Sequence, residues 1–131
     1  IYVMIKKYKL FLEGKKKFPN IQTKQIGEFV VHLGKDAKSN DYLTMIESDD
    51  DDLWFHAKGV PGSHVVIKIK DNLPTMEVIE EVAKLAAKNS KCKGDCTVVY
   101  CKSKFVTKDK GMNDGQVKVD YKNAEEIKVK I

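Results

Sequence analysis

The sequence predicts a single α+β domain with an antiparallel or mixed sheet of about six to seven strands and two helices. Short segments with alternating apolar and polar residues recur along the chain, and only two segments have helical spacing. No repeat, low-complexity tract or interdomain linker interrupts the 131 residues, which are enough to bury one core. We therefore treat residues 1–131 as one domain.

The first half begins with alternating segments at residues 8–12 and 29–33. The basic segment between them, residues 14–27, contains a proline and predicts a hairpin with a long loop. A short helix is expected after Gly34, with Asp36 or Asn40 as its cap. Its apolar stripe would consist of Tyr42, Leu43, Met45 and Ile46.

An acidic run at residues 49–52 precedes two further alternating runs, which flank a turn at residues 59–62. We interpret the acidic run as a solvated turn, because four adjacent carboxylates rarely converge on one cation. Alternation directs one set of side chains into a core: Leu53, Phe55, Ala57, Val65, Ile67 and Ile69. The other set would share the opposite face if the two strands pair: Asp52, Trp54, His56, His64, Val66 and Lys68.

The second half contains the clearest helix, at residues 74–89. Four of its residues fall on one face and would cover the core: Val78, Val82, Leu85 and Ala86. A strand at residues 97–102 follows, then a Lys-rich loop as far as residue 115. Alternating strands at residues 116–121 and 126–131 end the chain.

Charge and cysteine content narrow the function classes. The net charge is +5, and all 24 basic residues are Lys, which favours attraction to phosphate over bidentate reading of bases. Three closely spaced Cys, odd in number, are expected to be reduced thiols, and they lack the usual zinc-binding hook. No cofactor or metal is expected, and the absence of a long apolar run favours a cytoplasmic protein.

The polar face with Trp54, His56, His64 and Lys68 suggests a groove for unpaired nucleotides. An aromatic ring can stack on a base while cations hold the phosphates. If the imidazoles contact RNA, binding should strengthen as the pH falls through about 6.5, where an unperturbed imidazole gains its proton. The alternative is that a single Trp beside a His is half-buried packing.

Three stretches resemble one family, in that family's order. They read Gly34-Lys35-Asp36-Ala37-x-x-Asn40-Asp41, then Asp52-x-Trp54-Phe55-His56 with Pro61-Gly62-Ser63-His64-Val65-Val66, then Lys104-x-Val106-x-Lys108-x-Lys110-Gly111. The chain resembles the NFACT-R domain, the RNA-binding module of the ribosome quality-control proteins called RqcH in bacteria and NEMF in animals. Asp109 replaces a usual Pro, and Lys35 and Lys68 stand where Arg is frequent, so bidentate phosphate contacts are weakened.

The resemblance implies a non-catalytic RNA-binding domain, stand-alone or excised, that binds tRNA or ribosomal RNA and acts with the ribosome or a separate partner chain. The residues it implicates are Lys35, Asp36, Asn40, Trp54, His56, Ser63, His64, Lys68, Lys104, Lys108 and Lys110. Two alternatives stay open. His56 and His64 could act as acid and base in an RNA-processing enzyme, or the domain could bind a protein or DNA.

Overall fold

The computed structural model describes residues 18–131, and it confirms one α+β domain. Six strands form an antiparallel sheet in the order β1-β2-β4-β3-β5-β8. Their bounds are β1 Ile21–Ile26, β2 Phe29–Gly34, β3 Leu53–Ala57, β4 Val65–Ile67, β5 Asp95–Lys102 and β8 Glu125–Lys130. A ribbon of two short strands, β6 Val106–Thr107 and β7 Lys118–Val119, stands apart from this sheet.

The first hairpin differs from the sequence prediction. β1 lies inside the segment expected to be a loop, and it joins β2 through a tight turn at Gly27 and Glu28. Alternation did not reveal β1 because its four central residues, 22–25, are all polar and exposed. The strand predicted at residues 8–12 lies outside the described residues. The strand predicted at residues 116–121 is shorter than expected, since only β7 forms there.

Two α-helices are present among residues 18–131, as predicted. Helix α2, Ala37–Tyr42, is capped by Asp36, whose side chain accepts a hydrogen bond from the Ser39 amide, and it continues as the π-helical turn η1, Leu43–Glu47. The predicted apolar stripe was only half correct, because Met45 and Ile46 are 37% and 65% exposed. Helix α3, Met76–Lys88, begins at the cap Thr75.

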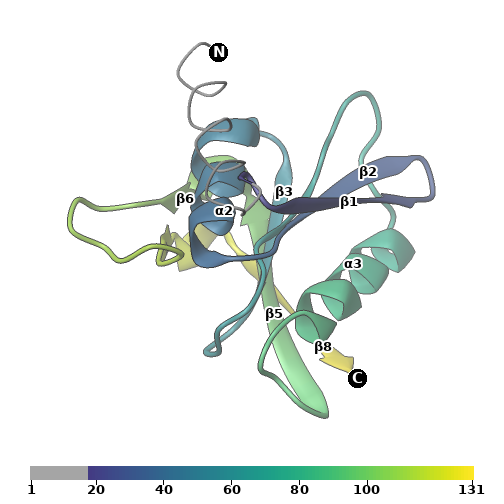
Figure 1. Ribbon diagram of the computed structural model, residues 1–131. Helices are drawn as coiled ribbons and strands as arrows, with labels where there is room; N and C mark the ends of the chain where they lie inside the picture. Colours follow the sequence, from purple (N-terminus) through teal and green to yellow (C-terminus); the bar gives the residue numbers. More distant parts are fainter. Residues whose placement is uncertain (1–17) are drawn as a thin grey trace.

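The sheet has a layer on each face (Figure 1). Helix α3 covers one face, where Phe55, Val65 and Ile67 join the larger core, as alternation predicted. Helix α2, η1 and the β6–β7 ribbon lie on the other face, over a smaller core. The smaller core contains Leu43, Trp54, Val66, Val99, Cys101 and Val106. Short 3₁₀ turns, η2 Ser103–Phe105 and η3 Tyr121–Asn123, lie in the segments around this ribbon.

The prediction of three reduced thiols was wrong for two of them. Cys92 and Cys96 form a disulfide, with their Cα atoms 6.0 Å apart. The turn around Gly94, between α3 and β5, brings them together, and the spacing of the cysteines along the chain did not indicate this pairing. Cys101 is a free thiol in the smaller core.

Candidate nucleic-acid interface

A hollow of about 410 Å³ gathers residues from four separate stretches of the chain. Its lining consists of Gly34, Lys35, Asp36, Ala37, Asn40, His56, Pro61, Gly62, Ser63, Asn89, Asp114 and Gly115. Five of the residues implicated by sequence therefore meet here: Lys35, Asp36, Asn40, His56 and Ser63. We call this feature the hollow.

Asn40 joins two walls of the hollow. Its Oδ1 accepts a hydrogen bond from the His64 amide at 3.0 Å, and its Nδ2 donates to the Gly62 carbonyl at 3.3 Å. A side chain on Gly34 would overlap the Asn40 side chain, so glycine is required at this point. Asn40 is buried, and both ends of its amide are used inside the protein, so it shapes the hollow more than it offers contacts to a ligand.

The end of α3 forms the next wall. The Ser63 amide donates to the Asn89 carbonyl at 2.9 Å, and the Lys91 amide donates to the Pro61 carbonyl at 2.9 Å. A Cβ atom on Gly62 would lie 2.5 Å from the Ser90 Cβ, so only glycine permits this close approach. These two backbone hydrogen bonds hold the turn before β4 against the end of the helix.

The loop between β6 and β7 closes the third side. Lys108 forms an ion pair with Asp41 at 3.2 Å and donates to the carbonyls of Asn113 and Gln116 at 2.6 and 2.7 Å. Asp41 also accepts a hydrogen bond from the Gly115 amide at 3.0 Å. Lys108 thus anchors the loop to α2 and has protein partners where a phosphate contact was expected. Asp41 is part of the first sequence motif, but the sequence did not indicate that it pairs with Lys108.

Lys35 and His56 are the two residues of the hollow with side chains suited to nucleic acid. The Lys35 ammonium donates to Asn89 Oδ1 at 3.2 Å, and the residue is otherwise exposed. The imidazole of His56 is partly exposed and stacks on the indole of Trp54, with ring centroids 5.8 Å apart. His56 is therefore the accessible end of a buried aromatic cluster.

Trp54 and His64 are buried below His56, with 0% and 1% of their surface exposed. Trp54 Nε1 donates to Thr44 Oγ1 at 3.0 Å, and the same oxygen lies 2.7 Å from His64 Nδ1. The expectation that Trp54 stacks on a base is therefore wrong for this structure, because α2, η1 and the ribbon cover that face of the sheet. Alternation gave the correct face but could not show that another layer covers it.

The protonation states follow from this burial. Burial, reinforced by the nearby His56, lowers the pKa of His64 to about 3. Burial also lowers the pKa of His56, against a hydrogen bond to the Gly62 backbone that raises it. The expected protonation near pH 6.5 is therefore wrong for His64, and for His56 the pKa lies lower than that.

Lys68 lies elsewhere, among carboxylates of the acidic run. Its ammonium is 2.5 Å from Asp52 and 3.2 Å from Asp49, and Asp52 is only 1% exposed. Burial acts to lower the pKa of Lys68, but the hydrogen bonds to Asp52 and Asp49 outweigh it and raise the pKa. Lys68 was expected to contact RNA, yet it neutralises a buried carboxylate, so the prediction of a fully solvated acidic turn is also wrong for Asp52.

The two remaining predicted lysines are exposed. Lys110 lies in the loop that closes the hollow, and Lys104 lies 5.4 Å from the centroid of the Phe105 ring. Within residues 18–131 no three metal-ligating side chains converge, and no helix there is long and apolar enough to cross a membrane.

The comparisons with known proteins agree on one family. The family model described as NFACT protein RNA binding domain matches residues 17–121. Two relatives are each called Rqc2 homolog RqcH: that of Bacillus subtilis is 40% identical over 90 residues, 67% of this chain, and that of Streptococcus suis is 47% identical over 68 residues, 51% of this chain. The chain spans only 15% and 12% of their respective lengths.

A solved structure shows the same fold. It is the C-terminal part of the fibronectin/fibrinogen-binding protein from Streptococcus suis, and it matches with a TM-score of 0.74 at 33% identity. The match covers 88% of this chain and 46% of that one. The chain therefore belongs to the family of NFACT protein RNA binding domains.

Proposed function

We propose that this domain binds RNA at the hollow, with Lys35 and His56 as its principal contacts. The observation that carries the proposal is convergence: three stretches that resemble the family motifs are far apart in sequence, and all contribute to this one feature or to its walls. The family description supports RNA as the ligand.

The chemistry of the hollow suits a single unpaired nucleotide. The exposed ammonium of Lys35 attracts a phosphate, and the neutral ring of His56 offers a surface for a base or a hydrogen bond. Asp36 Oδ1 caps α2 through the Ser39 amide, so its other oxygen is available to accept from a base amino group or a ribose hydroxyl. Lys110, in the adjoining loop, and Lys104 would add contacts to the phosphate backbone that do not depend on base sequence.

We further propose that the binding is non-catalytic. Acid–base cleavage needs two groups that reach the substrate, and His64 is 1% exposed and has a pKa of about 3. Because His64 is buried, the second imidazole of the suggested acid–base pair cannot reach a substrate at the surface. The arrangement therefore supports binding better than RNA processing.

The cellular role we propose is ribosome quality control, with tRNA or ribosomal RNA as the ligand and the cytoplasm as the location. The support is the similarity to proteins named RqcH, of which this chain matches a minor part. On this proposal the domain supplies RNA affinity.

Fluorescence anisotropy with a labelled single-stranded RNA and a labelled tRNA tests the binding. The logarithm of affinity should fall linearly with the logarithm of salt concentration. Lys35→Gln should reduce that slope by about 0.7 to 0.9, the share of one phosphate contact. Lys70→Gln removes the same charge at an exposed residue that follows β4, whereas Ser63 of the hollow precedes that strand, and this variant serves as the matched control.

His56→Ala should weaken binding by about 1 to 3 kcal/mol if the ring contacts a base. Recovery of intact RNA after incubation with the wild type would support the non-catalytic proposal. Binding that is indifferent to salt, or equal losses from Lys35→Gln and Lys70→Gln, would place RNA elsewhere or exclude it. Cleaved RNA that disappears in His56→Ala would favour the enzyme.

A further inference from the structure

A second recessed surface lies between β1 and α3, and no residue that lines it also lines the hollow. We propose that this groove is a docking site for an extended segment of a partner protein, which adds as a strand to the edge of β1 that has no neighbouring strand among residues 18–131. The proposal does not depend on RNA binding, and either can fail without the other.

The edge of β1 provides the backbone groups for such docking. β1 is the first strand in the sheet order and pairs with β2 along one side only, in the part of the chain that the structure describes. An edge strand leaves a row of N–H and C=O groups that another extended chain can satisfy. Addition of a strand to such an edge is a common mode of peptide recognition.

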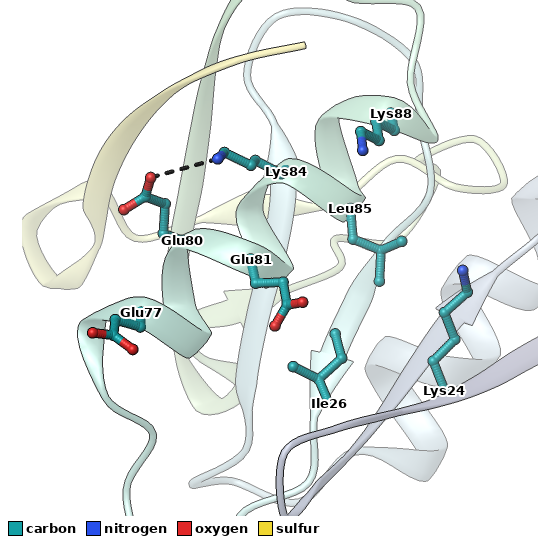
Figure 2. A pocket seen from close by; sticks show the side chains of 8 residues that line it. All are labelled: Lys24, Ile26, Glu77, Glu80, Glu81, Lys84, Leu85 and Lys88. Carbon is teal, nitrogen blue, oxygen red and sulfur yellow. Dashed lines mark ion pairs between the residues drawn. The ribbon is translucent and has the colours of Figure 1, made fainter.

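The groove beside this edge has a volume of about 620 Å³ (Figure 2). Three residues of β1 face the α3 side of the sheet: Gln22, Lys24 and Ile26. Lys24 pairs with Val31 of β2 and Ile26 with Phe29, and both of these β2 residues belong to the core under α3. Helix α3 packs mainly on β3, β5 and β8, and the groove lies between this helix and β1. Ile26 and Leu85, each only partly buried, form the apolar part of the groove.

The charges of the groove are divided along the helix. Glu77, Glu80 and Glu81 occupy the first half of α3, and Lys84 and Lys88 the second half, with Lys24 across from the helix on β1. Glu80 and Lys84 pair at 3.7 Å. Among residues 18–131, the other four charged groups of the groove have no ion-pair partner, so their charge is open to a ligand.

The separation of negative and positive charge along the groove indicates which residues a partner segment should carry. A segment with a basic residue near Glu77 and Glu81 and an acidic residue near Lys24 and Lys88 would complement both ends. An apolar residue between them would rest on Ile26 and Leu85. A nucleic acid fits less well, because the three carboxylates balance the three ammonium groups and leave the groove without the net positive charge that phosphates favour.

The dimensions fit a short strand. Glu77 and Lys88 are about 16 Å apart along the helix axis, at 1.5 Å per residue. Side chains on one face of a strand recur about every 6.6 Å, so three of them span about 13 Å. The expected recognition pattern is therefore basic, any, apolar, any, acidic.

The test is an NMR titration of the isotope-labelled protein with the acetylated, amidated heptapeptide Thr-Lys-Thr-Val-Thr-Glu-Thr. We expect saturable shifts at the amides of β1 and along α3. In an extended peptide, residues whose N–H groups point toward the neighbouring strand alternate with residues whose N–H groups point away from it. Methylation of the backbone nitrogens that point toward β1 should therefore abolish binding, and methylation of the other set should not.

Two variants supply the matched comparison. Glu81→Lys should weaken this peptide by about threefold, the effect of one exposed charge pair, and a peptide with Glu in place of its Lys should recover the affinity. Glu125→Lys on β8 makes the same charge change away from the groove and should have no effect.

Three results would overturn the proposal: no shifts at millimolar peptide, shifts confined to other surfaces, or equal binding by both methylated peptides. Concentration-dependent shifts of β1 in the protein alone would assign the edge to a second copy of this chain and would also contradict it.

Discussion

The two faces of the sheet are built from the same strands but differ in kind. On the face under α3, Phe55, Val65 and Ile67 join an apolar core that includes Val82 and Ala86. On the face under α2, the neighbouring residues Trp54, His64 and Thr44 form a buried chain of hydrogen bonds and ring contacts. The first face only packs, whereas the second both packs and fixes the walls of the hollow.

The difference shows which face of the sheet tolerates substitution less well. Apolar packing tolerates changes of shape, because no particular partner is required. A buried polar group must keep its partner, since an unsatisfied one costs about 1 to 3 kcal/mol. Substitutions of buried polar residues on the second face should therefore be tolerated less well, and this is the face that holds His56 at the surface.

The largest expected effect compares Trp54 and Phe55. Either residue changed to Ala should lower the free energy of unfolding by about 3 to 5 kcal/mol, because each is fully buried in its own core. Denaturant unfolding monitored by circular dichroism measures this.

Trp54→Leu separates packing from stacking, because leucine has no aromatic ring. It should reduce stability while the RNA affinity of the folded variant stays within about twofold, with Phe55→Leu as the control on the other face. A folded Trp54→Leu variant that has lost RNA binding, while Phe55→Leu keeps it, would restore the stacking role.

The pH dependence of stability should come from the second face. Because the folded-state pKa of His64 is about 3 and that of an unfolded His is 6.5, the unfolded state binds the proton more readily. The stability contribution of His64 should therefore be fully present above pH 6.5 and fall as the pH is lowered, by about 2 kcal/mol between pH 6.5 and 4.5.

Urea midpoints measured across this range test the linkage. His64→Gln should flatten the curve in that window, because it removes the titrating group. A curve that is equally steep in wild type and His64→Gln would assign the effect to other groups.

A smaller effect is expected from Thr44→Val. The change keeps the shape of the side chain but removes the oxygen that accepts from Trp54 Nε1 and contacts His64 Nδ1. We expect a loss of about 1 to 3 kcal/mol, typical of a buried donor left without its partner. Val82→Ala, which changes an apolar residue on the α3 face, should leave the pH dependence unchanged, whereas Thr44→Val should alter it. Identical pH profiles for the two variants would contradict the distinction between the faces.

Alternation and helical spacing were sufficient to predict which side chains of β3 and β4 share a face, and that helices follow Gly34 and lie within residues 74–89. The exact starts differ or were left open, since Asp36 rather than Asn40 caps α2 and α3 begins at Met76. They could not reveal β1, because a polar edge strand has no apolar alternation to detect. They also could not show that the Trp54 face is covered, since α2 and the ribbon reach it only through tertiary contacts.

The candidate site shows the same division. Motif resemblance brought together Lys35, Asp36, Asn40, His56 and Ser63, which do meet in the hollow. Whether a lysine is available to bind RNA depends on whether a carboxylate of the folded protein lies beside it. Lys68 is paired with Asp52 and Lys108 with Asp41, and neither pairing follows from spacing along the chain.

The most direct test of RNA binding at the hollow is an NMR titration of the labelled protein with a short single-stranded RNA. The proposal predicts the largest shifts at the amides of residues 34–40, 62–64 and 113–116, together with the ring protons of His56, saturating with one affinity. Shifts confined to α3 and β8, with those residues unchanged, would contradict it.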